Sequence, residues 1–345
     1  MATIGPVALT MTDWAKRLDD DGKIAQIVNL MSQTNEILDD MLWLEGNLPT
    51  GHKTTIRTGL PSAYWRLINQ GVPRGKSTTA QITESCGMLE TYSDVDEALV
   101  SLAGDAQAFR LSEDMAFIEG MNQQMAQTLF YNNTASTPAA YMGLAPRYPS
   151  VLTANSQTAN NVIDAGGLAS TNTSIWLVMW GPMSVHGIFP RGSKAGFQHQ
   201  DKGLVPLYDS NSNPYYGWRT HYKWDAGLVV KDWRYAVRIA NVDVTTLSGA
   251  SPPNLLNLLV RAIHRLPTQP ARAGNVQTTD APQLTMGRCA FYAARAITTW
   301  LDIQAMNKTN VLLKMEEFDG RAVTSFRGIP IRTCDQLLST EARVV

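Results

Sequence analysis

The chain has 345 residues, a formal net charge of −1 and only 17% charged residues, against about 25% in ordinary soluble domains. This balance argues against a protein that binds nucleic acid through a basic surface, because such a protein needs an excess of Lys and Arg. The three cysteines are too few and too scattered for a disulfide framework and suit a reducing compartment. The N-terminus lacks a secretory pattern, and the longest apolar run, Ile175 to Trp180, is too short to span a bilayer. We therefore expect a soluble protein with no membrane segment.

The first fifty residues predict helices. Apolar residues recur at three- and four-residue spacing from Ile24 to Met31 and again from Ile37 to Leu42. This spacing is typical of an amphipathic helix that packs one face on a core.

Residues 47–85 have a different character and predict a two-stranded ribbon. Side chains of residues 53–58 and 77–82 alternate in the manner of extended strands, and Gly and Pro residues lie between the two stretches. The segment has few apolar residues to form a core of its own, and an isolated two-stranded ribbon is marginally stable in water. The ribbon therefore either packs on its own domain or completes its folding against a neighbouring subunit.

Residues 93–131 again predict helix. Ser93 opens a weak capping pattern, and Ser112 is a good N-cap with two carboxylates in the following turn. An apolar stripe then runs from Met115 to Leu129, so a helix from Ser112 to Tyr131 would be about 30 Å long.

From residue 132 onward the pattern becomes richer in strands and loops. We predict strands at Ile175–Trp180, Val185–Phe189, Ala226–Val230 and Arg234–Val244, a helix capped by Ser251 and ended by Pro267, a helix at Ala293–Met306, and a short strand at Ser325–Arg332 broken by Pro330.

Motifs for chemistry are weak throughout the chain. Only three residues separate Gly71 from Gly75 ahead of Lys76, whereas a phosphate loop needs four and must open a helix. The five His residues are scattered and no zinc spacing occurs. We therefore expect no cofactor, no metal and no catalytic residue.

The aromatic segment Tyr215–Trp224 allows two interpretations. Aromatic side chains interleaved with Arg219 and Lys223 could stack on sugars, which suggests a carbohydrate-binding or carbohydrate-active protein as the alternative function. The favoured interpretation is packing inside the subunit or between subunits, where Trp and Arg are common anchors. We expect five tryptophans to be buried in one of these ways, with none lining a polar cleft: Trp176, Trp180, Trp218, Trp224 and Trp233.

Several segments, taken in order, resemble the major capsid proteins of tailed bacteriophages. They are Gly51–Pro61, Ser174–Gly181, Val185–Gly196, Arg219–Asp225, Asp232–Tyr235, Val237–Asn241, and Phe326–Ile331 with Asp335. Each is weakly specific alone, but their common order across nearly the whole chain is more specific.

The resemblance implies an α+β fold of the Hong Kong 97 type, with five parts. They are an N-terminal arm (1–46), an extended loop formed by the ribbon (47–85), a peripheral domain with a long spine helix (86–140), an axial domain (141–290), and a return segment shared by the two domains (291–345).

The implied function is a structural shell subunit, not an enzyme. Such a subunit assembles with itself as hexamers and pentamers into an icosahedral virion head around double-stranded DNA, in the cytoplasm of a bacterial host. No fused scaffold is recognised, so a separate scaffolding protein is expected, together with a portal and possibly a decoration protein. A non-viral nanocompartment shell of the same fold stays open as a further alternative.

The expected contacts between subunits join the ribbon to the long helix of a neighbour. The cations of the ribbon are Lys53, Arg57, Arg66, Arg74 and Lys76, and their expected counterparts are Glu113, Asp114 and Glu119. Because exposed ion pairs contribute little, Trp65 is the expected energetic anchor.

Overall fold

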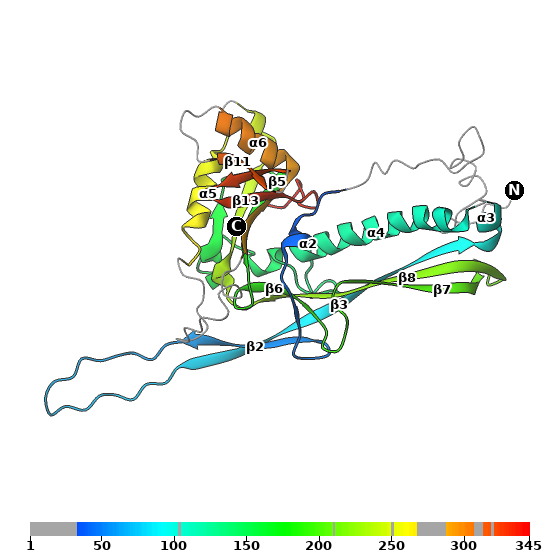
Figure 1. The fold of residues 1–345 in the computed structure, drawn as a ribbon. Coiled ribbons are helices and arrows are strands. Elements are labelled where there is room, and N and C mark those ends of the chain that lie inside the picture. The colour runs from blue at the N-terminus through cyan, green and yellow to red at the C-terminus, as the bar shows by residue number, and fades with distance from the viewer. Residues whose placement is uncertain are drawn as a thin grey trace.

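A computed structural model describes residues 33–102, 105–209, 211–249, 252–267, 288–306, 313–318 and 321–345. Figure 1 shows a mixed α/β body from which two long structures extend in opposite directions. One is the ribbon that contains β2, and the other is a long helix lying over a narrow sheet. The N-terminal helix expected near residues 24–31 lies outside the described residues.

Strand β3 (Thr78–Asp96) joins these two extensions. Its first part pairs antiparallel with β2 (Gly51–Gly59) in the ribbon, from Gly51 opposite Ser85 to Gly59 opposite Thr78. Its second part pairs antiparallel with β8 (Pro214–Val230). Nineteen residues of extended chain span roughly 60 Å, so one continuous strand connects the ribbon to the opposite end of the molecule.

The long helix α4 (Ala106–Tyr131) lies along the second half of β3 and has 26 residues, or about 39 Å of helix. It begins earlier than predicted, because the Asp105 side chain accepts hydrogen bonds from two first-turn N–H groups and caps it. Ser112 lies inside the helix, where its hydroxyl donates to the Phe109 carbonyl. The sequence pattern predicts a cap at Ser112, whereas the structure caps the helix earlier, with a carboxylate that satisfies the same orphan donors as a hydroxyl.

The sheet under α4 has three strands. β7 (Phe197–Tyr208) pairs antiparallel with β8, which pairs with β3. Ser93, expected near a helix start, lies within β3, and the short helix α3 (Glu97–Leu102) follows that strand. The predicted strand at 226–230 is therefore only the last part of a 17-residue strand.

The described part of the body has a buried mixed sheet and three helices. Its strands are β1 (Trp43–Glu45), β4 (Val162–Asp164), β5 (Asn172–Trp180), β6 (Val185–Phe189), β9 (Ala236–Asp243), β10 (Arg288–Ala293), β11 (Leu313–Phe318), β12 (Arg321–Phe326) and β13 (Ile329–Thr333). Its helices are α2 (Ile37–Asp40), α5 (Leu255–Ile263) and α6 (Arg295–Met306). Short 3₁₀ turns lie at Ala145–Arg147, Gln157–Asn161, Trp233–Tyr235 and Thr246–Ser248. β5 pairs antiparallel with both β9 and β10, and every residue of β9 is buried. The predicted strands at 175–180 and 185–189 are confirmed, as is the helix at 293–306, which begins at Arg295. The strand predicted at 234–244 is confirmed from Ala236 to Asp243, because Trp233–Tyr235 forms a 3₁₀ turn.

Two local predictions need correction. α5 is capped by the Asn254 side chain, which accepts from the Asn257 N–H, and Ser251 lies outside the described residues. The segment around Pro330 forms two strands, because Arg327 and Gly328 adopt positive φ angles of 53° and 77° and reverse the chain between β12 and β13. Pro330 then pairs within β13.

The helix expected over residues 37–42 shortens to a single turn. α2 ends at Asp40, and the chain then becomes extended as β1, which pairs in parallel with Gly187–Phe189 of β6. Pairing with a body strand overrides the helical spacing here. Among the helices that the structure describes, none is long and apolar enough to cross a membrane.

The spatial units do not follow continuous ranges of the chain. β7 and β8 fall within residues 141–290, the range assigned to an axial domain, yet both lie beside α4 through their pairing with β3. The chain leaves the body and returns, so the boundaries of the five capsid parts stay a prediction.

Candidate assembly surfaces

The ribbon tip, residues 60–77, projects into solvent away from the body (Figure 1). Every residue of the tip is exposed, including large apolar side chains. Trp65 has a relative exposure of 104%, Ile68 88% and Leu60 80%. Exposed aromatic and aliphatic clusters of this kind mark interaction sites in soluble proteins.

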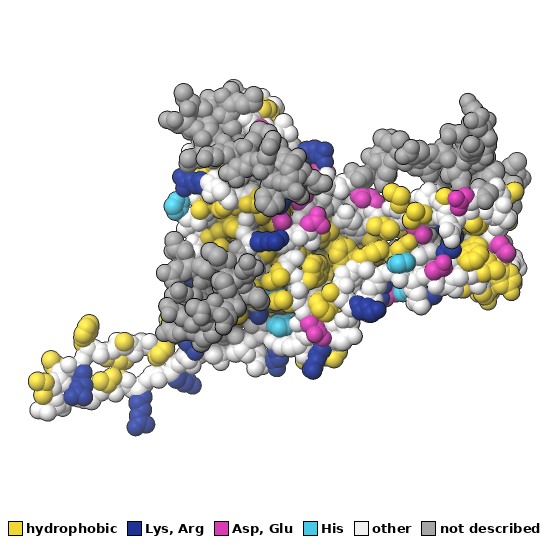
Figure 2. Space-filling model, viewed as in Figure 1, with side chains coloured by type: hydrophobic (Ala, Val, Ile, Leu, Met, Phe, Trp, Pro, Cys, Tyr) yellow, Lys and Arg dark blue, Asp and Glu magenta, His cyan; other side chains and the backbone are white. Residues whose placement is uncertain are grey.

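The ribbon is also uniformly basic. Lys53, Arg57, Arg66, Arg74 and Lys76 are all exposed, and no Asp or Glu occurs between Glu45 and Glu84. Figure 2 accordingly shows yellow and dark blue side chains along the ribbon, without magenta. Within the described part of the chain, none of these five cations forms an ion pair. The Gly71–Lys76 stretch lies in this tip and leads into β3 rather than into a helix.

The three acidic residues expected to meet the ribbon lie in different environments on α4. Asp114 is 7% exposed and faces Tyr222 of β8, whose pKa is raised by burial and then by a hydrogen bond with Asp114. Glu119 accepts hydrogen bonds from the Gln33 N–H and the Gln123 amide. Glu113 lines a groove described below. The structure thus turns Asp114 inward. Of the three acidic residues, only Glu113 and Glu119 remain candidates for contact with a neighbouring subunit.

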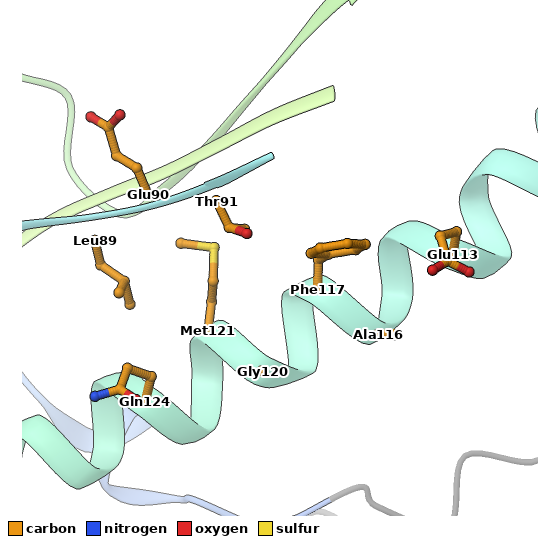
Figure 3. Close-up of a pocket in the computed structure, with 9 residues that line it drawn as sticks. All are labelled: Leu89, Glu90, Thr91, Glu113, Ala116, Phe117, Gly120, Met121 and Gln124. Atoms are coloured by element: carbon orange, nitrogen blue, oxygen red, sulfur yellow. The ribbon is translucent and has the colours of Figure 1, made fainter. Parts of the chain in front are cut away.

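A groove of about 380 Å³ separates α4 from β3. In Figure 3, Leu89 of β3 and Met121 and Phe117 of α4 point into the space between the two elements, whereas Glu90 points away from the helix. A second hollow of about 180 Å³ shares Leu89 and Gln124 with it. We call the two together the helix–strand groove; its lining residues are Gly87, Met88, Leu89, Glu90, Thr91, Glu113, Ala116, Phe117, Gly120, Met121, Gln124, Met125, Thr128, Ala139, Ala140 and Tyr141.

An ion pair fixes β3 where the ribbon meets the body. Glu84 is buried and receives two hydrogen bonds from Arg147, at 2.5 and 2.8 Å. The same guanidinium donates to the carbonyls of Met142 and Leu228. A bidentate pair with its remaining donors satisfied has defined geometry, so it orients the root of the ribbon. Sequence reasoning missed it, because the two residues are 63 positions apart.

A pair of histidines lies at the same junction. His186 of β6 is 0% exposed and meets the His52 ring of β2 edge-on, with centroids 5.9 Å apart. Both ring nitrogens of His186 are buried, and a backbone contact with Gly181 only partly offsets the effect of burial on its pKa. Burial first, then Lys231 and His52, lowers the pKa of His186 to about 3, and burial and Lys231 also lower the pKa of His52. The His186 imidazole is therefore neutral near pH 7, and the lowered pKa of His52 favours its neutral form as well.

The aromatic segment Tyr215–Trp224 packs mainly within the subunit. The Arg110 guanidinium lies 4.9 Å from the Trp218 ring centroid, and Tyr222 is buried under α4. Among the five tryptophans expected to be buried, Trp176 and Trp180 are fully so, and the other three are half-buried.

Trp224 corrects the expectation that no tryptophan lines a polar cleft. It borders a hollow of about 520 Å³ together with Phe197, Glu36 and Asp39. Glu36 is paired there with Arg332 of β13 at 3.2 Å. Aromatic and acidic side chains therefore do share a surface hollow. The choice between a capsid subunit and a carbohydrate-binding protein rests on the similarity to known proteins given below.

No group of three His, Cys, Asp or Glu side chains suited to a metal occurs in the described ranges. The chemistry displayed by this surface is instead that of association: an apolar basic tip at one end and an apolar groove flanked by acidic residues at the other.

A long helix lying over a narrow sheet, a projecting two-stranded ribbon and a mixed α/β body together define a capsid subunit of the Hong Kong 97 type. The family model for the major capsid protein GP7 matches residues 19–345, and the chain belongs to this family.

A solved structure agrees with this family. A chain in the structure of bacteriophage Epsilon15 is 36% identical in sequence, with a TM-score of 0.77, and the match covers 100% of this chain and 99% of that chain. A chain of the bacteriophage JBD30 capsid matches with 9% identity and a TM-score of 0.46, over 89% of this chain and 92% of that chain. No curated protein sequence matches the chain. The protein is therefore a structural component of a phage capsid, and nothing in these comparisons supports the carbohydrate alternative.

Proposed function

We propose that this capsid protein assembles as hexamers and pentamers into an icosahedral head that encloses double-stranded DNA, with the ribbon of each subunit extending over the next. The observation that carries this proposal is the continuity of β3. One strand runs from the ribbon root to the far end of the sheet under α4, so the ribbon tip and the α4 surface point in opposite directions.

The ribbon is too long to fold back on its own subunit without breaking its strands. Ser85 pairs with Gly51 at the root, and β3 begins at Thr78, so about 23 Å of paired strand separates the root from the exposed tip at residues 60–77. A contact between the front of one subunit and the back of the next is heterologous, and such contacts close into rings when the rotation between subunits permits. Hexamers and pentamers are rings of this type.

The energy of the ribbon contact comes mainly from apolar surface. Exposed ion pairs of the ribbon cations with Glu113 or Glu119 would contribute about 0–1 kcal/mol each. Trp65 is a better anchor, because aromatic side chains dominate the energy of protein interfaces. The ion pairs then set register and orientation.

DNA is held by confinement rather than by a basic lining. The net charge of −1 leaves no overall excess of cations to neutralise phosphates. We expect purified capsomers to bind duplex DNA weakly at physiological salt in a fluorescence anisotropy titration. Nanomolar binding with a steep dependence on salt would contradict this part of the proposal.

Assembly in the host cytoplasm with a separate scaffolding protein, a portal and a decoration protein completes the proposal, and this part of it rests on family resemblance. The structural role requires no catalytic residue.

The test of the shell function is deletion of residues 70–76, which lie in the exposed tip. The variant should remain soluble and folded by circular dichroism, because the deleted residues pack on nothing in the subunit. Size-exclusion chromatography and negative-stain microscopy should show capsomers or monomers where the parent chain forms closed shells. An unchanged yield of shells would contradict the role of the ribbon.

A further inference from the structure

We propose that the hollow of about 520 Å³ bordered by Trp224, which we call the Trp224 hollow, binds a small alkylammonium ion. The hollow lies between the segment that leads into α2, the long helix α4 and the paired strands β7 and β8. The proposal goes beyond the shell function, since the contact between ribbon and neighbour does not use this site.

Two aromatic rings form one wall of the Trp224 hollow. The rings of Phe197 and Trp224 are nearly perpendicular, at 82°, with their centroids 6.3 Å apart. Phe197 is 39% exposed and Trp224 is half-buried, so the corner between them opens to solvent. The negative faces of aromatic rings attract cations, and cages of aromatic rings bind alkylated ammonium groups in proteins.

A carboxylate lines the same hollow. Asp39 is exposed, and no ion pair of its side chain occurs among the described residues. Glu36 also lines the hollow, but Arg332 pairs with it at 3.2 Å and neutralises its charge. The residues that line the hollow include no Lys, Arg or His. Asp39 is therefore the uncompensated charge at this site, and it favours a cation.

Asn35 gives a second, independent indication of a missing group. It lines the hollow and is only 7% exposed, yet neither Oδ1 nor Nδ2 of its side chain has a hydrogen-bond partner among the described residues. Buried polar side chains are nearly always hydrogen-bonded in native proteins. An ammonium group has three donors and no acceptor, so it suits both the Asn35 carbonyl oxygen and the Asp39 carboxylate.

The remaining wall suits an alkyl chain. Leu38 of α2 and Ile118 of α4 line the hollow together with the aromatic corner. The space exceeds that of a single ammonium head and has apolar side chains for the carbon stem. We therefore assign the site to a free amine with its short alkyl chain, rather than to the Lys side chain of a protein partner.

Binding of butylammonium chloride to the purified full chain tests the proposal, with 1-butanol as the neutral counterpart of the same length. Titrations followed by saturation-transfer NMR give the dissociation constant of each probe. Butylammonium should bind at least tenfold more tightly than butanol, because only the cation is attracted by the ring faces and by Asp39. Equal binding of the two probes would show a merely apolar hollow and would overturn the proposal.

Two variants locate the site. Asp39→Asn removes the charge with little change of shape and should weaken butylammonium binding at least tenfold. Phe197→Leu removes one ring and should weaken it at least threefold. The matched controls are Glu97→Gln, an exposed carboxylate of α3, and Tyr208→Leu, an exposed aromatic residue at the end of β7, and both should bind as the parent does. If Phe197→Leu did not fold, Asp39→Asn and the comparison with butanol would still decide.

A lysine blocked at both its amino and carboxyl groups separates a free amine from a protein side chain. It should bind more weakly than butylammonium, because its backbone groups must also be accommodated. Tighter binding of the blocked lysine by tenfold would assign the site to a protein partner and overturn the free ligand. No binding of butylammonium to the parent, or unchanged binding to Asp39→Asn, would overturn the site itself. The yield of shells, which tests the shell function, is a separate measurement.

Discussion

The ribbon and the central strands of the body are both made of paired β-strands, but they are stabilised in different ways. β9 is buried along all of its length between β4 and β5, whereas β2 alternates between half-buried and exposed residues and its tip contacts nothing. The body therefore has its stabilising contacts within one subunit. The ribbon carries large apolar side chains whose burial requires another copy, so the two regions should respond differently to mutation and to assembly.

The largest expected effect tests the body side of this comparison. Trp180 is buried in β5, and its indole N–H donates to the Tyr292 hydroxyl at 2.7 Å, which donates in turn to Asp40 at 2.9 Å. Trp180→Ala should lower the free energy of unfolding by about 3–5 kcal/mol, measured by urea denaturation of the unassembled subunit. Trp65→Ala is the control and should leave that free energy unchanged. Similar losses in both variants would remove the distinction between the two regions.

An intermediate effect is expected where the two regions meet. Because the folded-state pKa of His186 is about 3, below the ordinary value near 6.5, the unfolded chain binds the additional proton between these values. Stability should therefore be complete above about pH 6.5 and fall as the pH decreases. At pH 5 the loss from this group amounts to about 2 kcal/mol.

The measurement is the free energy of unfolding between pH 7.5 and 5 for the parent and for His186→Phe, which cannot titrate. The variant should lose less stability on acidification, and His264→Gln at an exposed position should follow the parent. If His186→Phe and the parent lost stability in parallel, the buried histidine would not be the cause.

The smallest expected effect concerns single charges on the ribbon. Arg74→Gln should leave the stability of the subunit unchanged and weaken assembly by less than about 1 kcal/mol per contact. The critical concentration for assembly, followed by light scattering at low and high salt, should show a difference that fades as salt increases. A large effect that persisted at high salt would indicate a buried ion pair instead.

The sequence predicted the parts of the fold that depend on local pattern. The polar alternation around Lys53 and the long apolar run from Ile175 to Trp180 were sufficient to place the ribbon and a buried strand. The pattern led to Ser112 as the cap of α4 and missed Asp105, because a carboxylate and a hydroxyl can accept the same bonds at a helix start.

Contacts between distant segments could not be predicted from pattern. The Glu84–Arg147 pair and the His52–His186 pair each join residues that only the register of β2, β3 and β6 brings together. For the candidate assembly surfaces, sequence identified the cations and Trp65 on one side. It did not find the groove, whose walls come from β3 and α4, and it included Asp114, which the helix turns toward Tyr222.

The most direct test of the central claim, that a neighbour completes each ribbon, is a cryo-electron microscopy reconstruction of the assembled shell at a resolution that shows side chains. We predict density for the Trp65 indole against the adjacent subunit in every hexamer and pentamer. A Trp65 side chain in solvent, or one packed on its own subunit, would contradict the account.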